Sequence, residues 1–179
     1  MKLRHALLPA LLAPTMALAH PGHGAGFDAG LIHPFTGADH LLAMIAVGLW
    51  AAMLGGNARC AVPATFLTAT AIGGTFAMAT GLGTLEQAVE PAILASVIVL
   101  GAVVALSLRA RLSAALPMVA LFGLAHGAAH GLAFGIAMLT STAILHGIGL
   151  ALGLSLNAKV LRLSGFLAVA AGLGLALQG

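Results

Sequence analysis

The sequence predicts an all-α membrane protein, a polytopic bundle of six transmembrane helices that follow a cleaved signal peptide. Of its 179 residues, 61% are hydrophobic and only 6% are charged, and so few charges cannot cover a soluble domain of this size. The apolar runs are about twenty residues long and do not alternate, which favours helices over membrane strands. The 24 glycines suit helices that pack closely in lipid, where small residues line the contacts.

The N-terminus has the parts of a secretory signal. Lys2 and Arg4 precede an apolar run, Ala6–Leu18, which is too short to span a bilayer comfortably. Small residues then end this run at Ala19. We expect residues 1–19 to be removed and residues 20–179 to form one transmembrane domain. The alternative is a retained first helix, which would give seven spans.

Six apolar stretches follow the predicted signal peptide. They run over Pro34–Leu54, Val62–Leu82, Ala88–Leu108, Ala114–Phe134, Ile136–Leu156 and Val160–Leu177. If these spans alternate in direction, all seven Lys and Arg residues fall on one side of the membrane. Basic loops stay in the cytoplasm. The pattern therefore predicts a bacterial inner-membrane protein with the mature N-terminus and the C-terminus both in the periplasm.

Ionisable side chains inside a span are functional candidates, because lipid penalises them. The candidates are Asp39 and His40 in the first span, with His33 at its outer lip, His126 and His130 in the fourth span, and His146 in the fifth. His126 and His130 are four residues apart and share a helix face, where two imidazoles can bind one divalent ion. Asp39 can ligate a metal directly or orient a ligating imidazole. The sequence predicts a metal or proton site in the periplasmic half, with His146 the next step inward.

The predicted mature N-terminus adds two further candidates. After cleavage the chain would begin with His20, and His23 follows three residues later. A free amine with two imidazoles can capture a metal ion near the entrance of a transport path. Pro21 has no amide N–H, so the common square-planar amino-terminal chelate cannot form. Functional and accidental explanations of these histidines both stay open.

Two motifs resemble those of a known family. The stretch from His33 to Ala51, HPFTGADHLLAMIAVGLWA, resembles the HPxxGxDHxxAMxxVGxWA signature of the HupE/UreJ family of nickel or cobalt permeases. HGAAHG, from His126 to Gly131, resembles the family's second motif, HGxAHG. The resemblance covers essentially the whole chain and implies a metal path through His33, Asp39, His40, His126 and His130. The chain departs from the family at Ala133, where a glutamate usually follows the second motif.

The resemblance and the residues together favour uptake of nickel or cobalt. Imidazole suits nickel, copper and zinc, and the absence of clustered thiolates argues against a Cu(I) path. The ion would be cargo, with no permanently bound cofactor and no enzymatic activity, and the resemblance implies a link to hydrogenase or urease maturation. An intramembrane zinc-dependent hydrolase is the alternative. A haem protein is disfavoured, because histidines at i, i+4 would approach the same haem face.

Overall fold

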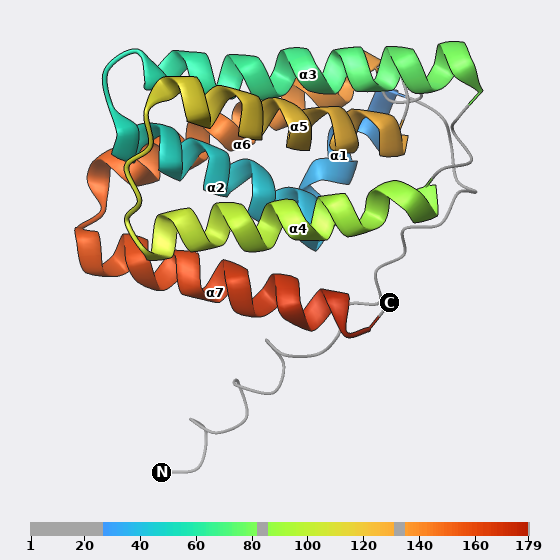
Figure 1. The fold of residues 1–179 in the computed structure, drawn as a ribbon. Coiled ribbons are helices and arrows are strands. Elements are labelled where there is room, and N and C mark those ends of the chain that lie inside the picture. The colour runs from blue at the N-terminus through green and yellow to red at the C-terminus, as the bar shows by residue number, and fades with distance from the viewer. Residues whose placement is uncertain (1–26, 82–85, 131–134, 179) are drawn as a thin grey trace.

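The computed structural model describes residues 27–81, 86–130 and 135–178, and the regular structure of these residues is entirely helical (Figure 1). The predicted signal peptide, the candidates His20 and His23, and Ala133 lie outside the described residues. The helices are α1 (Phe27–Thr36), α2 (Ala38–Leu54), α3 (Ala58–Thr80), α4 (Glu86–Ala105), α5 (Leu112–His130), α6 (Gly135–Ser155) and α7 (Ala158–Ala176).

The described helices include several that can cross a membrane. Four of them, α3, α5, α6 and α7, are long and apolar enough, and α1 and α2 add a fifth span if this bent pair crosses as one. The continuously described apolar part of α4, Val89–Ala105, is shorter. The all-helical architecture is therefore confirmed for the described residues, with four to five candidate spans, whereas the count of six spans stays a prediction.

The first predicted span, Pro34–Leu54, is not one helix. The chain bends by 76° between α1 and α2, and Gly37 at the bend has an extended backbone with φ −77° and ψ 113°. Glycine has a low helix propensity, and Asp39 in the first turn of α2 suits the positive end of that helix's dipole. The break therefore places His33 on one helix and His40 on the next.

Helix α2 lies at the centre of the bundle (Figure 1) and contacts α1, α3, α4, α6 and α7. The most extensive helix pairs are α3 with α5, α2 with α6, and α4 with α7. The apolar core contains Met44, Val47 and Trp50 of α2, Phe66 of α3, Val97 and Leu100 of α4, Val119 of α5 and Leu145 of α6. Because α2 is buried on most sides, His40 near its start is held inside the protein rather than at its surface.

Glycines let two of these helix pairs approach backbone to backbone. A Cβ atom on Gly48 of α2 would overlap the carbonyl oxygen of His146, and one on Gly149 of α6 would overlap that of Ile45. A Cβ atom on Gly127 of α5 would likewise overlap the carbonyl oxygen of Thr70 in α3. The expectation that small residues line the helix contacts is confirmed at these positions.

The third predicted span, Ala88–Leu108, is corrected at its C-terminal end, because α4 stops at Ala105. Beyond it, Ser107 has a positive φ of 54°, which turns the chain out of the helix. The indole Nε1–H of Trp50 donates a 2.9 Å hydrogen bond to the carbonyl oxygen of Leu108. This bond ties the segment after α4 to α2, although the apolar character of the sequence continues to Leu108.

Candidate metal site

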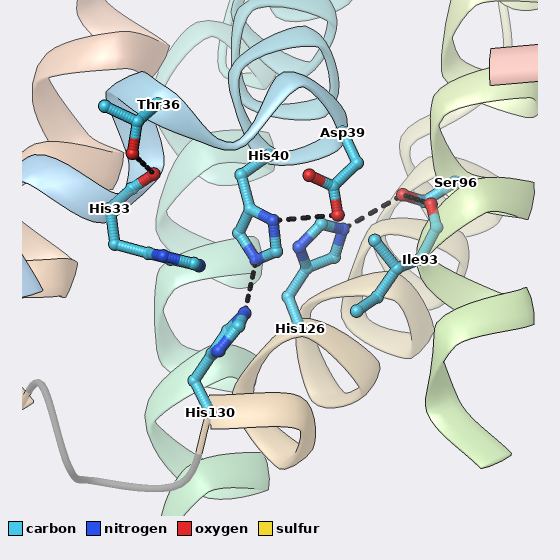
Figure 2. A network of polar contacts seen from close by, with 8 residues as sticks. All are labelled: His33, Thr36, Asp39, His40, Ile93, Ser96, His126 and His130. Atoms are coloured by element: carbon cyan, nitrogen blue, oxygen red, sulfur yellow. Dashed lines mark hydrogen bonds and ion pairs between the residues drawn. The ribbon is translucent and has the colours of Figure 1, made fainter. Parts of the chain in front are cut away.

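Four imidazoles from α1, α2 and α5 meet beside the bend between α1 and α2 (Figure 2). The ring of His40 lies at the centre of this group. Its centroid is 5.2 Å from that of His33, 4.6 Å from that of His126 and 4.6 Å from that of His130. The rings of His33 and His130 are also 4.6 Å apart. The bend thus brings together motifs that lie about ninety residues apart in the chain.

Three of these histidines can share one metal ion. His33, His40 and His130, which we call the His triad, each offer a ring nitrogen, and these nitrogens all lie within 4.8 Å of one another. Bonds of about 2.0–2.1 Å from imidazole to a divalent ion place two ligand nitrogens roughly 3–3.5 Å apart. Small side-chain rotations would therefore bring the His triad into coordinating geometry.

Asp39 fixes which nitrogen His40 presents to the His triad. The Nδ1 atom of His40 is 3.1 Å from Oδ2 of Asp39, and its Nε2 atom is 2.8 Å from Nε2 of His130. An ionised carboxylate has no proton to donate, and its negative charge beside Nδ1 favours the form of neutral His40 that carries its proton on Nδ1 and has a lone pair on Nε2. His130 donates to that lone pair until a metal ion takes its place. A carboxylate that orients a metal-binding imidazole in this way is a recurring feature of metal sites.

His126 has a different partner from the His triad. Its Nε2 atom is 3.0 Å from Oγ of Ser96 on α4, and Oγ of Ser96 is 2.6 Å from the carbonyl oxygen of Ile93. The one hydroxyl proton of Ser96 is donated to that carbonyl, so Ser96 accepts from the Nε2–H of His126. The Nδ1 lone pair of His126 then faces the protein interior without a partner among the described residues.

The sequence predicted that His126 and His130 share one helix face and bind one ion together. In the structure, only His130 belongs to the His triad. His126 is completely buried and contacts the ring of His40 from another side. The two rings therefore have different neighbours, and binding of one ion by both of them stays a prediction.

His146 lies outside the His triad, on α6. It is 2% exposed, and its ring centroid is 5.2 Å from that of Phe66. Phe66 also contacts His126, with the two ring centroids 5.4 Å apart. Sequence reasoning missed both Phe66 and Ser96. A serine within the apolar run of α4 was a usable signal, whereas nothing distinguished Phe66 from the other phenylalanines.

Comparison with known proteins identifies relatives along most of the chain. Residues 8–177 match the family model described as HupE / UreJ protein. Protein HupE from Rhizobium leguminosarum bv. viciae is 39% identical over 156 residues, which cover 80% of this chain and 80% of that protein. No solved structure matches the chain. The residues matched by the family model include the segments that contribute the His triad.

Proposed function

The chain belongs to the HupE/UreJ family, and from that premise we propose that it carries nickel or cobalt ions across the bacterial inner membrane. The observation that supports this proposal most directly is the His triad, in which three imidazoles and an orienting carboxylate meet inside a membrane protein. We further propose that both termini of the mature chain face the periplasm and that the imported ion supplies hydrogenase or urease maturation.

The donor atoms suit a borderline transition-metal ion. Neutral imidazoles bind nickel, cobalt, copper and zinc well, whereas magnesium and calcium prefer sites built from oxygen ligands. The single cysteine, Cys60, is exposed at the start of α3 and is not part of the site. Family membership supports nickel or cobalt over the other ions that imidazoles accept.

The arrangement also suits transient binding, which transport requires. An ion entering the His triad replaces the hydrogen bond between His40 and His130, so contacts within the protein hold these two rings close together before an ion binds. The carboxylate of Asp39 is partly exposed, at 31%, while His40 behind it is buried. Asp39 therefore places a negative charge at the accessible side of the site, where it attracts a cation.

Uptake of radiolabelled Ni²⁺ by cells that express the protein, in a host without its own nickel permease, tests the proposed function. We expect accumulation above that of cells with an empty vector, with Co²⁺ competing more strongly than Mg²⁺. Membrane fractionation confirms that the protein is inserted. An inserted protein that moves none of Ni²⁺, Co²⁺ and Zn²⁺ would refute the transport proposal.

The exchange Asp39→Asn tests the orienting role of the carboxylate. The amide keeps the size of the side chain but removes the charge and no longer enforces the Nδ1–H form of His40. Loss of such a partner typically lowers metal affinity about 10–100-fold, and we expect a decrease of that size in Ni²⁺ titrations of the purified protein. Asp28→Asn, at an exposed acid on α1, is the matched control. Equal affinities in the two variants would contradict the role given to Asp39.

A further inference from the structure

Two polar side chains on α6 are buried without hydrogen-bond partners. His146 is 2% exposed and Thr142 is 0% exposed. The two ring nitrogens of His146 and the hydroxyl oxygen of Thr142 form no hydrogen bond with any described residue. Buried polar groups are nearly always hydrogen-bonded. Three buried polar atoms without partners therefore indicate a position where a ligand can bind.

The unused hydroxyl of Thr142 differs from those of two other helical threonines. Thr140, two residues earlier on α6, donates a 2.8 Å hydrogen bond to the carbonyl oxygen of Ile136, and Thr70 on α3 donates a 2.9 Å bond to that of Phe66. Thr142 does not use this ordinary bond to its own helix. Because Thr142 and His146 are four residues apart, they share one helix face. Their unused atoms can thus bind the same ion.

Phe66 connects this pair to the site described above. Its ring contacts His146 on α6 and His126 on α5, with centroid distances of 5.2 Å and 5.4 Å. The Nδ1 atom of His126 is also buried and unused. Imidazoles with unused lone pairs therefore contact the same phenyl ring, and the face of such a ring attracts a cation that has lost its water.

We propose that Thr142 and His146 form a second, inner metal-binding station, which receives the transported ion from the His triad by way of His126 and the ring of Phe66. This inference rests on the proposed function and extends it to the next position of the ion. The station offers a neutral imidazole and a neutral hydroxyl, so it selects the same class of transition-metal ion as the His triad.

The His triad has a carboxylate beside it, whereas the inner station has none among the described residues, and this difference favours release of the ion from the inner station. Among the acids whose side chains the structure describes, Asp39 lies beside His40 of the His triad, while Asp28 and Glu90 are exposed. The inner station therefore has no described carboxylate and binds the ion more weakly than the His triad does. A transport path requires such weak sites, because an ion that binds too tightly does not leave.

The exchange Thr142→Val is the sharpest test. Valine keeps the shape of threonine, and no described hydrogen bond is lost, so the melting temperature should stay equal or rise. We expect Ni²⁺ uptake to fall about tenfold, similar to the effect of losing a supporting group in other metal sites. Thr142→Ser should restore uptake, and Thr140→Val, at an exposed position on the same helix, should leave it unchanged. Wild-type uptake by Thr142→Val with an equal or raised melting temperature would overturn the proposal.

A binding measurement separates this inference from the proposed function. In Ni²⁺ titrations of the purified protein we expect a strong site and a second, weaker site. Thr142→Val and His146→Leu should remove the weaker site and keep the stronger one. This result would support the inner station even if wild-type protein failed to transport Ni²⁺. Titrations that show a single site, unchanged in both variants, would refute the station even if transport were demonstrated.

Discussion

The exchange His40→Ala is expected to abolish Ni²⁺ uptake, with a decrease on the order of 100-fold or more. His40 is the ring that contacts His33, His126 and His130, and it is the partner of Asp39. Alanine removes one ligand of the His triad and leaves the carboxylate without the group that it orients. The decrease in uptake should exceed the 10–100-fold effect that is typical when only a residue that orients a metal ligand is removed. Initial rates of radiolabelled Ni²⁺ uptake, divided by the amount of inserted protein, measure it.

A matched control separates this chemical effect from damage to the core. Met44 lies one turn further along α2 and is completely buried, so Met44→Ala also creates a cavity in the same helix. Replacing a buried methionine by alanine typically costs about 2–5 kcal/mol of stability, yet it removes no ligand. We expect Met44→Ala to lower the melting temperature while the inserted protein still takes up Ni²⁺. His40→Ala with wild-type uptake would rule out the His triad as the transport site.

The sequence predicted the helical membrane class and most helix positions, because both depend on local composition. The predicted spans Ala114–Phe134, Ile136–Leu156 and Val160–Leu177 lie within a few residues of α5, α6 and α7 where the structure describes them. The start of α3 was placed four residues late, at Val62 instead of Ala58. Hydropathy ends a span at a charge such as Arg59, whereas the helical hydrogen bonds continue past it.

The bend at Gly37 was only partly predictable. Proline and glycine both disfavour a regular helix, as Pro34 and Gly37 do here, but the apolar pattern carries no information on the direction of the chain. A separate helix α1 before the bend was therefore missed. Its consequence for the site is large, since His33 and His40 face each other across the bend. In a single regular helix, His33 and His40 would also lie on the same face, because they are seven residues apart, but they would follow each other along the helix axis.

The sequence predicted which histidines belong to the candidate site, but it did not predict which partner each of them contacts. Spacing of four residues along a helix predicts that His126 and His130 share a face, but the helices opposite that face decide what each ring meets. Ser96 of α4 binds His126, and His40 of α2 binds His130. Such contacts between distant segments depend on tertiary packing, which the spacing within one helix does not encode.

The exchange Gly127→Ala is expected to disrupt both the fold and uptake. A Cβ atom at Gly127 would overlap the carbonyl oxygen of Thr70 and crowd the backbone nitrogen of Gly74 at 2.8 Å. These are backbone atoms of α3, so no side chain can rotate away, and α3 and α5 must separate. Overpacking of this kind typically costs about 1–3 kcal/mol. Because His126 and His130 lie on the displaced helix, we expect a lower melting temperature in detergent together with loss of Ni²⁺ uptake.

Gly147 provides the same exchange with the opposite expected result. It follows His146 on α6 just as Gly127 follows His126 on α5, but a Cβ atom there would meet nothing within 4 Å. Alanine in an open helical position is favoured over glycine by about 0.5–1 kcal/mol, so Gly147→Ala should keep or raise the melting temperature and preserve uptake. If Gly127→Ala matched Gly147→Ala in both measurements, the close approach of α3 and α5 would be wrong. In the structure, the two glycines differ because the backbone of α3 lies against Gly127, while no atom lies against Gly147. Being next to a site histidine in the sequence is therefore not expected to make a glycine essential by itself.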